Sequence, residues 1–246
     1  MSESVPAVSI VIPTFNEEHY SPKLLESLLA IQDKVDVIVA DGDSSDRTVE
    51  AVTEFIPRFK APSSLRVISA PRGISSQRNA GAYAAKNEIL LFLDADVIIP
   101  SAEAYRALIH SFETSGCVAA SAHLTPLERT VRGYLVYGFF DIVQSVFLRL
   151  RKPCFGTFCF ITTRKVFDAL GGFDVKKHVT EDIDFCNRAQ ELGNLCHLPV
   201  RIPVSERRFV KYGYWNVFWL YLKEGFLYLT IGAPRLKTIV YPFGEY

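Results

Sequence analysis

The sequence has few cysteines, no excess of either charge and none of the low-complexity composition that accompanies disorder. Its 246 residues carry 27 basic and 27 acidic side chains, so the formal net charge is zero and no chain-wide field attracts nucleic acid. The five cysteines are odd in number and show no C-x-x-C spacing. We therefore expect buried, reduced thiols in a cytosolic protein, with no disulfide framework and no nucleic-acid partner.

The sequence also lacks a recognisable leader and a long uninterrupted apolar run. The N-terminus, MSESVPAVSIVIP, has no basic region before an apolar stretch, so we expect no signal peptide and a cytoplasmic location. The apolar stretches 134–150 and 214–232 contain charged or amide side chains and fall short of the ~20 uninterrupted apolar residues that span a bilayer. Their aromatic residues leave two alternatives open: packing on the protein or at a homodimer contact, or peripheral docking on the inner face of the cell membrane.

Short apolar runs alternate with helical spacing through the first half of the chain. The runs are apolar on both faces, as in buried parallel strands, and cover 8–12, 35–40, 65–69 and 89–93. Helical spacing covers 22–31, 46–56 and 75–86. This alternation predicts an α/β protein with a mostly parallel, doubly wound sheet flanked by helices.

The alternation loosens after residue 100. We expect helices at 101–115, 130–150 and 180–192, the last with Thr180 as N-cap, and strands at 117–123 and 157–163. No repeat or flexible linker divides the chain. We therefore expect one domain over 1–246, with a ligand-binding half (1–100), a catalytic half (101–209) and an apolar, aromatic-rich helical extension (210–246).

Polar residues follow the predicted parallel strands where ligands bind such sheets, beyond the carboxyl ends. Asp94 and Asp96 are the most specific of these pairs. Side chains two residues apart at the end of a strand point the same way, so the two carboxylates could offer hard oxygens to one divalent cation. The alternative is a solvated acidic turn. Asp41 or Asp43 could accept hydrogen bonds from a nucleobase, in a loop where Ser45 or Asp46 caps the next helix.

Three further groups have both a functional and a structural interpretation. Arg78, one turn into a helix, suits a phosphate or ribose edge but could equally be a solvated residue. Glu181 and Asp182 lie in the first turn of a helix. There they could interact with the helix dipole, or one of them could act as a general base. Arg207 and its neighbour Arg208 suit a diphosphate, or an ion pair with Glu206. The five histidines show no zinc spacing and receive no role, with a coordinating histidine from the late part of the chain as the alternative.

Six motifs, taken in order, resemble those of family 2 glycosyltransferases: PTFNEE, DGDSSDRT, RGISSQRNAG, FLDADV, GGFD and TEDIDFCNRA, over about residues 7–209. The resemblance implies a GT-A (Rossmann-like) fold and inverting transfer of a hexose from a nucleotide-diphosphate sugar, with Mg²⁺ or Mn²⁺. It also implies the roles of individual residues: donor binding by Thr14 and Glu17, nucleotide proximity for Arg78, cation and diphosphate binding by Asp94 and Asp96, and general base catalysis by Asp182.

The sequence departs from the family pattern in two places. Many relatives have a second Asp where this chain has Gly42, so Asp41 and Asp43 become the substitutes for base recognition. The Gln-x-x-Arg-Trp motif of processive synthases is missing, which favours transfer of a single sugar. The acceptor is open between a lipid, a lipid phosphate and a glycan: the hydroxyl of a lipid or glycan needs a base, whereas a lipid phosphate, already anionic, does not.

Two rival functions share some of these residues. A sugar nucleotidyltransferase also pairs carboxylates with a metal, but it would need a Gly-rich phosphate loop where this chain has the acidic PTFNEE. A non-catalytic nucleotide-sugar-binding subunit is disfavoured by the presence of Asp94, Asp96 and Asp182 together.

Overall fold

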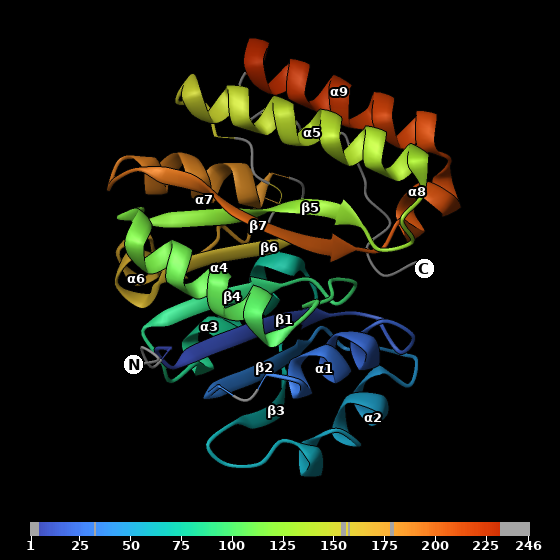
Figure 1. Cartoon of the computed structure of the whole chain (residues 1–246), viewed down its shortest axis with the longest axis vertical. Helices are drawn as coiled ribbons and strands as arrows, with labels where there is room; N and C mark the ends of the chain where they lie inside the picture. The colour runs from blue at the N-terminus through green and yellow to red at the C-terminus, as the bar shows by residue number, and fades with distance from the viewer. Residues whose placement is uncertain (1–4, 32, 154–155, 157, 178–179, 232–246) are drawn as a thin grey trace.

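Seven strands form one sheet in the order β3-β2-β1-β4-β6-β5-β7, with helices on both faces (Figure 1). The structure is a computed structural model that describes residues 5–31, 33–153, 156, 158–177 and 180–231, with side chains described as far as residue 223. The predicted mostly parallel α/β sheet is confirmed.

The first four strands are parallel to one another and lie close to their predicted positions. They are β1 (Val8–Thr14), β2 (Val35–Asp41), β3 (Ser64–Ser69) and β4 (Ile89–Leu93). Every residue of β1, β2 and β4 is buried, since helices cover both faces. In β1, Val8, Ile10 and Ile12 face one core cluster and Val11 faces the other.

Three more strands extend the sheet beyond β4. β6 (Cys159–Thr163) pairs antiparallel with β4 and with β5 (Ala119–Pro126), and β7 (Leu195–Val204) pairs parallel with β5 at the edge. The strand predicted at 117–123 therefore begins two residues later and runs three residues further.

Helices on the two faces bury different clusters. One face carries α1 (Ser21–Leu29), α2 (Thr48–Thr53) and α4 (Ala102–Ser115), and the other carries α3 (Ile74–Ala84), α6 (Arg164–Leu170) and α7 (Glu181–Gln190). The helix predicted at 46–56 is shorter than expected, because Pro57 lies in a separate 3₁₀ turn, η1 (Ile56–Arg58).

The two predicted helix caps differ in detail. Arg47 occupies the N-cap position of α2, and Asp46 acts from one residue earlier by accepting a hydrogen bond from the Thr48 backbone at 3.0 Å. Thr180 is the N-cap residue of α7 as predicted, but its side chain makes no capping hydrogen bond.

Aromatic-rich helices lie beyond the β5–β7 end of the sheet (Figure 1). These are α5 (Val131–Arg149), α8 (Arg207–Tyr212) and α9 (Tyr214–Ile231). The rings of Phe140 and Tyr221 lie 5.3 Å apart and join α5 to α9. Within the described part of the chain, α5 is the one helix whose length and hydropathy suffice to cross a membrane. The end of the predicted extension, 232–246, lies outside the described residues.

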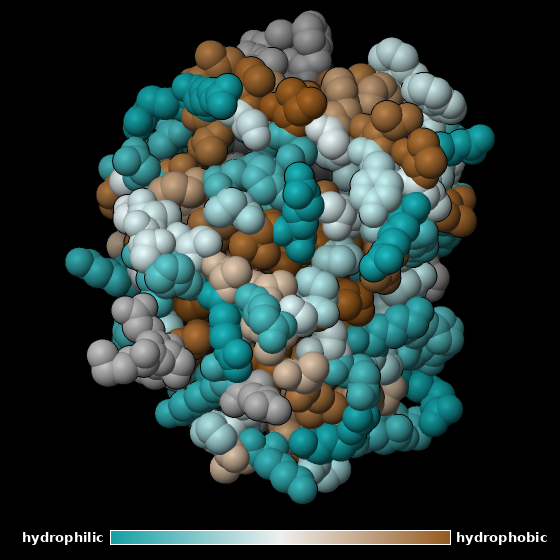
Figure 2. All heavy atoms as spheres, viewed as in Figure 1, coloured by the Kyte–Doolittle hydropathy of each residue, from teal (hydrophilic) through white to brown (hydrophobic). Residues whose placement is uncertain are grey.

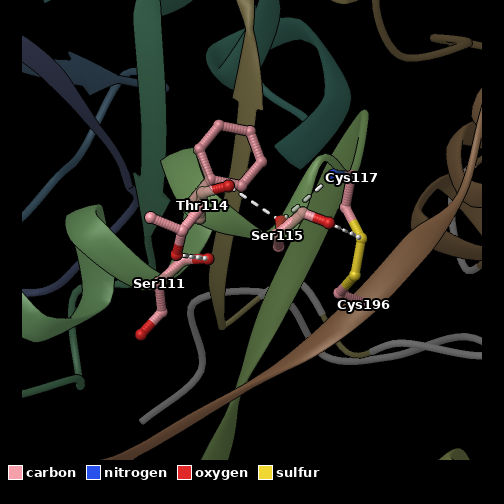
Figure 3. The surroundings of a disulfide bond; sticks show 6 residues. Ser111, Thr114, Ser115, Cys117 and Cys196 are labelled. Carbon is pink, nitrogen blue, oxygen red and sulfur yellow. Dashed lines mark hydrogen bonds between the residues drawn. A yellow bond between two sulfur atoms is a disulfide. The ribbon is translucent and has the colours of Figure 1, made fainter.

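The expectation of reduced thiols is wrong for two cysteines. Cys117 and Cys196 form a disulfide with their Cα atoms 6.1 Å apart (Figure 3). The pairing arises because Cys117 lies two residues before the start of β5 and Cys196 lies on β7, which runs parallel beside β5. Cys159 is free and buried, as expected, Cys186 is buried, and Cys154 lies outside the described residues.

Candidate active site

The candidate site lies at the carboxyl ends of β1, β2 and β4, where the polar loops converge. The turn after β4 carries Asp94 and Asp96 and is held by backbone hydrogen bonds on two sides. The Asp94 amide donates to the Phe158 carbonyl, and the Ser205 amide donates to the Asp96 carbonyl, each at 3.0 Å. The apolar side chains of Ala95 and Val97 alternate with the two aspartates and are buried in the core, so the two carboxylates lie on the opposite side of the turn from the core.

Arg78 joins this turn to the start of α7. Its guanidinium is 1% exposed and donates from Nη2 to Asp94 Oδ1 at 2.8 Å and from Nη1 to Glu181 Oε1 at 3.0 Å. Arg78 is therefore not a solvated residue. Two of its five N–H groups bond these carboxylates, so its contact with a nucleotide stays a prediction.

A turn containing Gly171 and Gly172 brings α7 to this position. Both glycines have left-handed backbones, with φ of 69° and 76°, and a Cβ at Gly172 would lie 2.6 Å from Asn79 Oδ1. The Asn79 amide bonds Phe173 in both directions, at 2.8 Å each. The RNAG and GGFD motifs thus form one clamp that positions the α7 carboxylates.

Burial perturbs both carboxyl groups at the start of α7. It raises the pKa of Glu181, against the opposing charge of Arg78. It also raises the pKa of Asp182 well above its ordinary range, and the neighbouring charge of Glu181 adds to this shift. Asp182 Oδ1 accepts a hydrogen bond from the Ile183 amide at 2.7 Å. In its ionised form, a carboxylate whose pKa is raised is a stronger base than an ordinary aspartate.

Arg207 lies on the other side of the site and bridges two acids. It donates from both terminal nitrogens to Glu17, at 2.6 and 2.7 Å, and from Nε to Asp96 Oδ2 at 2.8 Å. The alternative pairing with Glu206 is therefore wrong, since Glu206 accepts from Thr130 at 2.7 Å instead. Burial raises the pKa of Glu17 to about 7, although Arg207 opposes the shift.

The donor set at the end of β4 fits a hard divalent cation. Asp96 Oδ1 is buried and has no hydrogen-bond partner among the residues that the structure describes, which is costly for a carboxylate oxygen unless a ligand occupies it. The charges of Asp96 and Asp94 add to the effect of burial in raising the pKa of Glu17, so negative charge is concentrated at this point. Carboxylate oxygens are the ligands that Mg²⁺ and Mn²⁺ prefer.

The first two loops are joined to each other beside this donor set. Thr14 Oγ1 donates to Asp41 Oδ1 at 3.2 Å, and the Ser44 amide donates to Asp41 Oδ2 at 2.9 Å. The buried Asp41 carboxylate is thus held by protein donors. Asp43 is exposed in a left-handed conformation, with φ of 66°, and remains accessible to a ligand.

Gln77 was not identified from the sequence and explains the glycine at position 42. Its buried amide donates to the carbonyls of Thr14 and Ala40, tying the ends of β1 and β2 to α3. A Cβ at Gly42 would lie 2.8 Å from Gln77 Nε2. Any larger residue at position 42 would displace this amide, and no sequence signal distinguished Gln77 from an ordinary helical glutamine.

A cavity of about 320 Å³ opens beside Arg207, on the α1 and α8 side of the site. Its walls combine cations with apolar side chains. They are Tyr20, Lys23, Leu127, Glu128, Ser205, Arg207, Val210 and Lys211.

Comparison with known proteins identifies the family. The model of glycosyl transferase family 2 matches residues 9–171. The 4,4'-diaponeurosporenoate glycosyltransferase of Staphylococcus haemolyticus is 36% identical over 110 residues, which is 45% of this chain and 29% of that protein. The undecaprenyl-phosphate 4-deoxy-4-formamido-L-arabinose transferase of Pectobacterium atrosepticum is 30% identical over 128 residues, 49% of this chain and 39% of that protein. These matches span well under half of the relatives.

Solved structures share the fold at low sequence identity. Mannosyltransferase PcManGT from Pyrobaculum calidifontis, in complex with GDP-Man and Mn²⁺, superposes with a TM-score of 0.63 at 20% identity, over 81% of this chain and 57% of that one. S. aureus TarS 1–349 in complex with UDP-GlcNAc gives a TM-score of 0.59 at 20% identity, over 81% and 56%. With the GT-A fold and a family match over more than half of its length, the chain belongs to glycosyl transferase family 2.

Proposed function

We propose that this protein transfers a single hexose, with inversion, from a nucleotide-diphosphate sugar to an acceptor that is a membrane lipid or lipid phosphate. The observation that carries the proposal is the convergence of Glu17, Asp94, Asp96 and the α7 carboxyls around two arginines at one edge of the sheet. In this proposal residues 1–100 supply the donor site and 101–209 supply the acceptor side.

The donor would lie against the first loops. Thr14, Glu17, Asp41 and Asp43 are the proposed donor contacts, with exposed Asp43 the best placed of the acids to accept from a nucleobase. Asp94 and Asp96 would hold Mg²⁺ or Mn²⁺, which would supply charge neutralisation for the leaving diphosphate. PcManGT bound to GDP-Man and Mn²⁺ and TarS bound to UDP-GlcNAc support a donor of this class.

The two arginines would have different tasks. Arg207 is held between Glu17 and Asp96, at the carboxylates proposed to lie next to the diphosphate, so its guanidinium could neutralise the charge that develops there. Arg78 is buried behind Asp94 and Glu181, and acts as a positioning residue that fixes the distance between the cation site and α7.

Asp182 is the proposed general base, with Glu181 beside it. Its raised pKa suits removal of a proton from an acceptor hydroxyl as the glycosidic bond breaks on the opposite face of the sugar. If the acceptor is a lipid phosphate, no proton has to be removed, and Asp182 would orient the acceptor instead.

The exposed surface of α5 supports a lipid acceptor and a peripheral position at the inner face of the membrane. Leu135 is 70% and Ile142 66% exposed, whereas the polar Asp141 and Gln144 face the sheet and bond its histidines. This is the reverse of an ordinary surface helix, which faces its polar side outward. Figure 2 shows apolar side chains gathered at the α5 and α9 end of the molecule.

Release of nucleoside diphosphate tests the proposal. The purified chain is incubated with Mn²⁺ and, in turn, UDP-, GDP- and dTDP-sugars, with and without a polyprenyl phosphate. We expect metal-dependent release from one donor. In Asp182→Asn, the rate of sugar transfer to a hydroxyl acceptor should fall roughly 100-fold or more, with donor affinity retained. The rate of transfer to a phosphate acceptor should change little.

The exposed acid Asp168 on α6 offers a matched control, and Asp168→Asn should behave as wild type in every assay. Donor binding without any turnover would favour a binding subunit instead. Pyrophosphate release from a sugar phosphate and a nucleoside triphosphate would favour a nucleotidyltransferase.

A further inference from the structure

Two of the histidines that the sequence left without a role meet a carboxylate where α5 packs on β5 and β7. His123 on β5, His197 on β7 and Asp141 on α5 each offer one ligand atom, and all three atoms lie within 4.8 Å of one another. His123 Nδ1 lies 2.5 Å and His197 Nδ1 3.7 Å from Asp141 Oδ1. The two imidazole rings stand at 76° to each other, with centroids 4.8 Å apart.

The sheet register explains why residues so far apart in sequence meet. Ser121 on β5 pairs with His197 on β7. The register shifts after Ala122, so that His123 pairs with Arg201, and across this irregularity the rings of His123 and His197 lie 4.8 Å apart. α5 packs on β5 and β7 and presents Asp141 and Gln144, which are three residues apart and therefore on the same side of the helix.

The two ring nitrogens of His197 face different groups. Nε2 lies 3.2 Å from Gln144 Oε1, and Nδ1 lies 3.7 Å from Asp141 Oδ1; the tautomer with its proton on Nε2 would donate to the amide oxygen and present the Nδ1 lone pair on the side of Asp141. An imidazole that ligates through one nitrogen while donating from the other to a second residue is the usual arrangement of a metal-bound histidine.

The cluster is also accessible from one side. The His197 side chain is 7% exposed, whereas those of His123 and Asp141 are 28% and 32% exposed. A cation could therefore enter past His123 and Asp141 and keep a water molecule as a fourth ligand.

We propose that His123, Asp141 and His197 form a binding site for Zn²⁺ or a similar divalent transition metal, distinct from the Asp94–Asp96 site, that fastens α5 to the sheet. Two imidazole nitrogens and one carboxylate oxygen are a ligand set typical of zinc, whereas Mg²⁺ prefers oxygen alone. The site links the helix with the exposed apolar surface to β5 and β7, so occupancy would hold that surface in place.

Titration of the full-length, chelator-treated protein with Zn²⁺ tests this directly. We expect one high-affinity equivalent, retained in the Asp94→Asn, Asp96→Asn double variant and in the control His110→Gln, which changes an exposed histidine on α4. His123→Gln, Asp141→Asn and His197→Gln should each weaken binding at least 10-fold, and Gln144→Leu should weaken it less. Equal affinity in wild type and His197→Gln would overturn the proposal, as would loss of binding in the Asp94, Asp96 double variant.

Two further measurements use the wild-type protein alone, so their outcome does not depend on whether the variants fold. X-ray absorption at the zinc edge should show nitrogen and oxygen neighbours with the outer-shell scattering of two imidazole rings. Scattering from sulfur, or from oxygen alone, would contradict the assigned ligands. One equivalent of Zn²⁺ should also raise the melting temperature of the wild type, and an unchanged melting temperature would contradict a cation that fastens α5 to the sheet.

Discussion

Arg78 Nη1 and Glu181 Oε1 lie 3.0 Å apart in the interior, although the two residues are separated by 103 positions in the sequence. Through Arg78 Nη2 the same guanidinium reaches Asp94. One buried cation thus connects the turn after β4 with the first residue of α7. The distance between the proposed cation site and the proposed base depends on this side chain.

Replacing Arg78 with methionine should destabilise the fold as well as the site. The change leaves Asp94 and Glu181 without their buried counter-charge, and breaking a buried pair in this way costs about 3 to 5 kcal/mol. The free energy of unfolding measured with urea checks this. The control Arg47→Met removes an exposed ion pair with Glu50 and should leave stability unchanged. Equal stability of Arg78→Met and wild type would contradict the assigned role.

Asp36 should make stability depend on pH in the acid range. Burial raises its pKa, but hydrogen bonds from Arg66, Ser64 and Ser9 outweigh burial and lower the pKa overall. Because the folded state therefore binds the proton less tightly than the unfolded state, the carboxylate stabilises the fold above its unfolded pKa of about 4 and loses this effect as pH falls through the lower, folded value.

Arg66→Met checks this assignment. Arg66 also donates to the Ala84 carbonyl at 2.6 Å, so the variant should be less stable than wild type at pH 7. The difference in the free energy of unfolding should shrink as pH is lowered toward 3, because the partner of Arg66 becomes neutral. A difference that stays constant between pH 7 and pH 3 would show that the Asp36 charge does not contribute.

Much of the fold could be predicted because its signals are local. The continuous apolar runs in β1, β2 and β4 identify buried parallel strands, and the residues after them had to meet at one edge of the sheet. Asp94 and Asp96 were found in this way. The capping details of α2 and α7 were less accurate, because tertiary contacts compete with local preferences at helix ends.

The remaining features depend on which strands pair, and sequence spacing does not determine this. The neighbourhood of β5 and β7 creates both the Cys117–Cys196 disulfide and the meeting of His123 with His197. The partners of Arg207 were likewise unpredictable. Glu206 is adjacent in sequence, but the fold presents Glu17, 190 positions away, to the guanidinium.

Alkylation without reduction should distinguish the described cysteines. In denatured, unreduced protein, Cys159 should react completely, and Cys117 and Cys196 should remain joined in one disulfide-linked peptide pair. Mass spectrometry of the digest measures this. Full alkylation of Cys117 without a reductant would show that the original expectation of reduced thiols was right.

The exposed apolar surface of α5 should bind membranes. We expect the intact chain to co-sediment with vesicles that contain anionic lipids, and the triple variant Leu135→Ser, Ile142→Ser, Val146→Ser to stay in the supernatant, because these residues are 70%, 66% and 44% exposed. Val49→Ser changes an apolar residue 40% exposed on α2 and should sediment as wild type does. Wild-type protein recovered entirely in the supernatant would refute membrane docking.

The most direct test of the account is nucleotide-sugar binding with and without Mn²⁺, compared between wild type and Asp96→Asn by calorimetry. Asp96 Oδ1 is a buried carboxylate oxygen without a hydrogen-bond partner among the described residues, so the variant should lose the metal-dependent gain in affinity, by about 100-fold, while Asp168→Asn retains it. Asp96→Asn that binds the donor and Mn²⁺ as tightly as wild type would contradict the central claim that this carboxylate holds the cation.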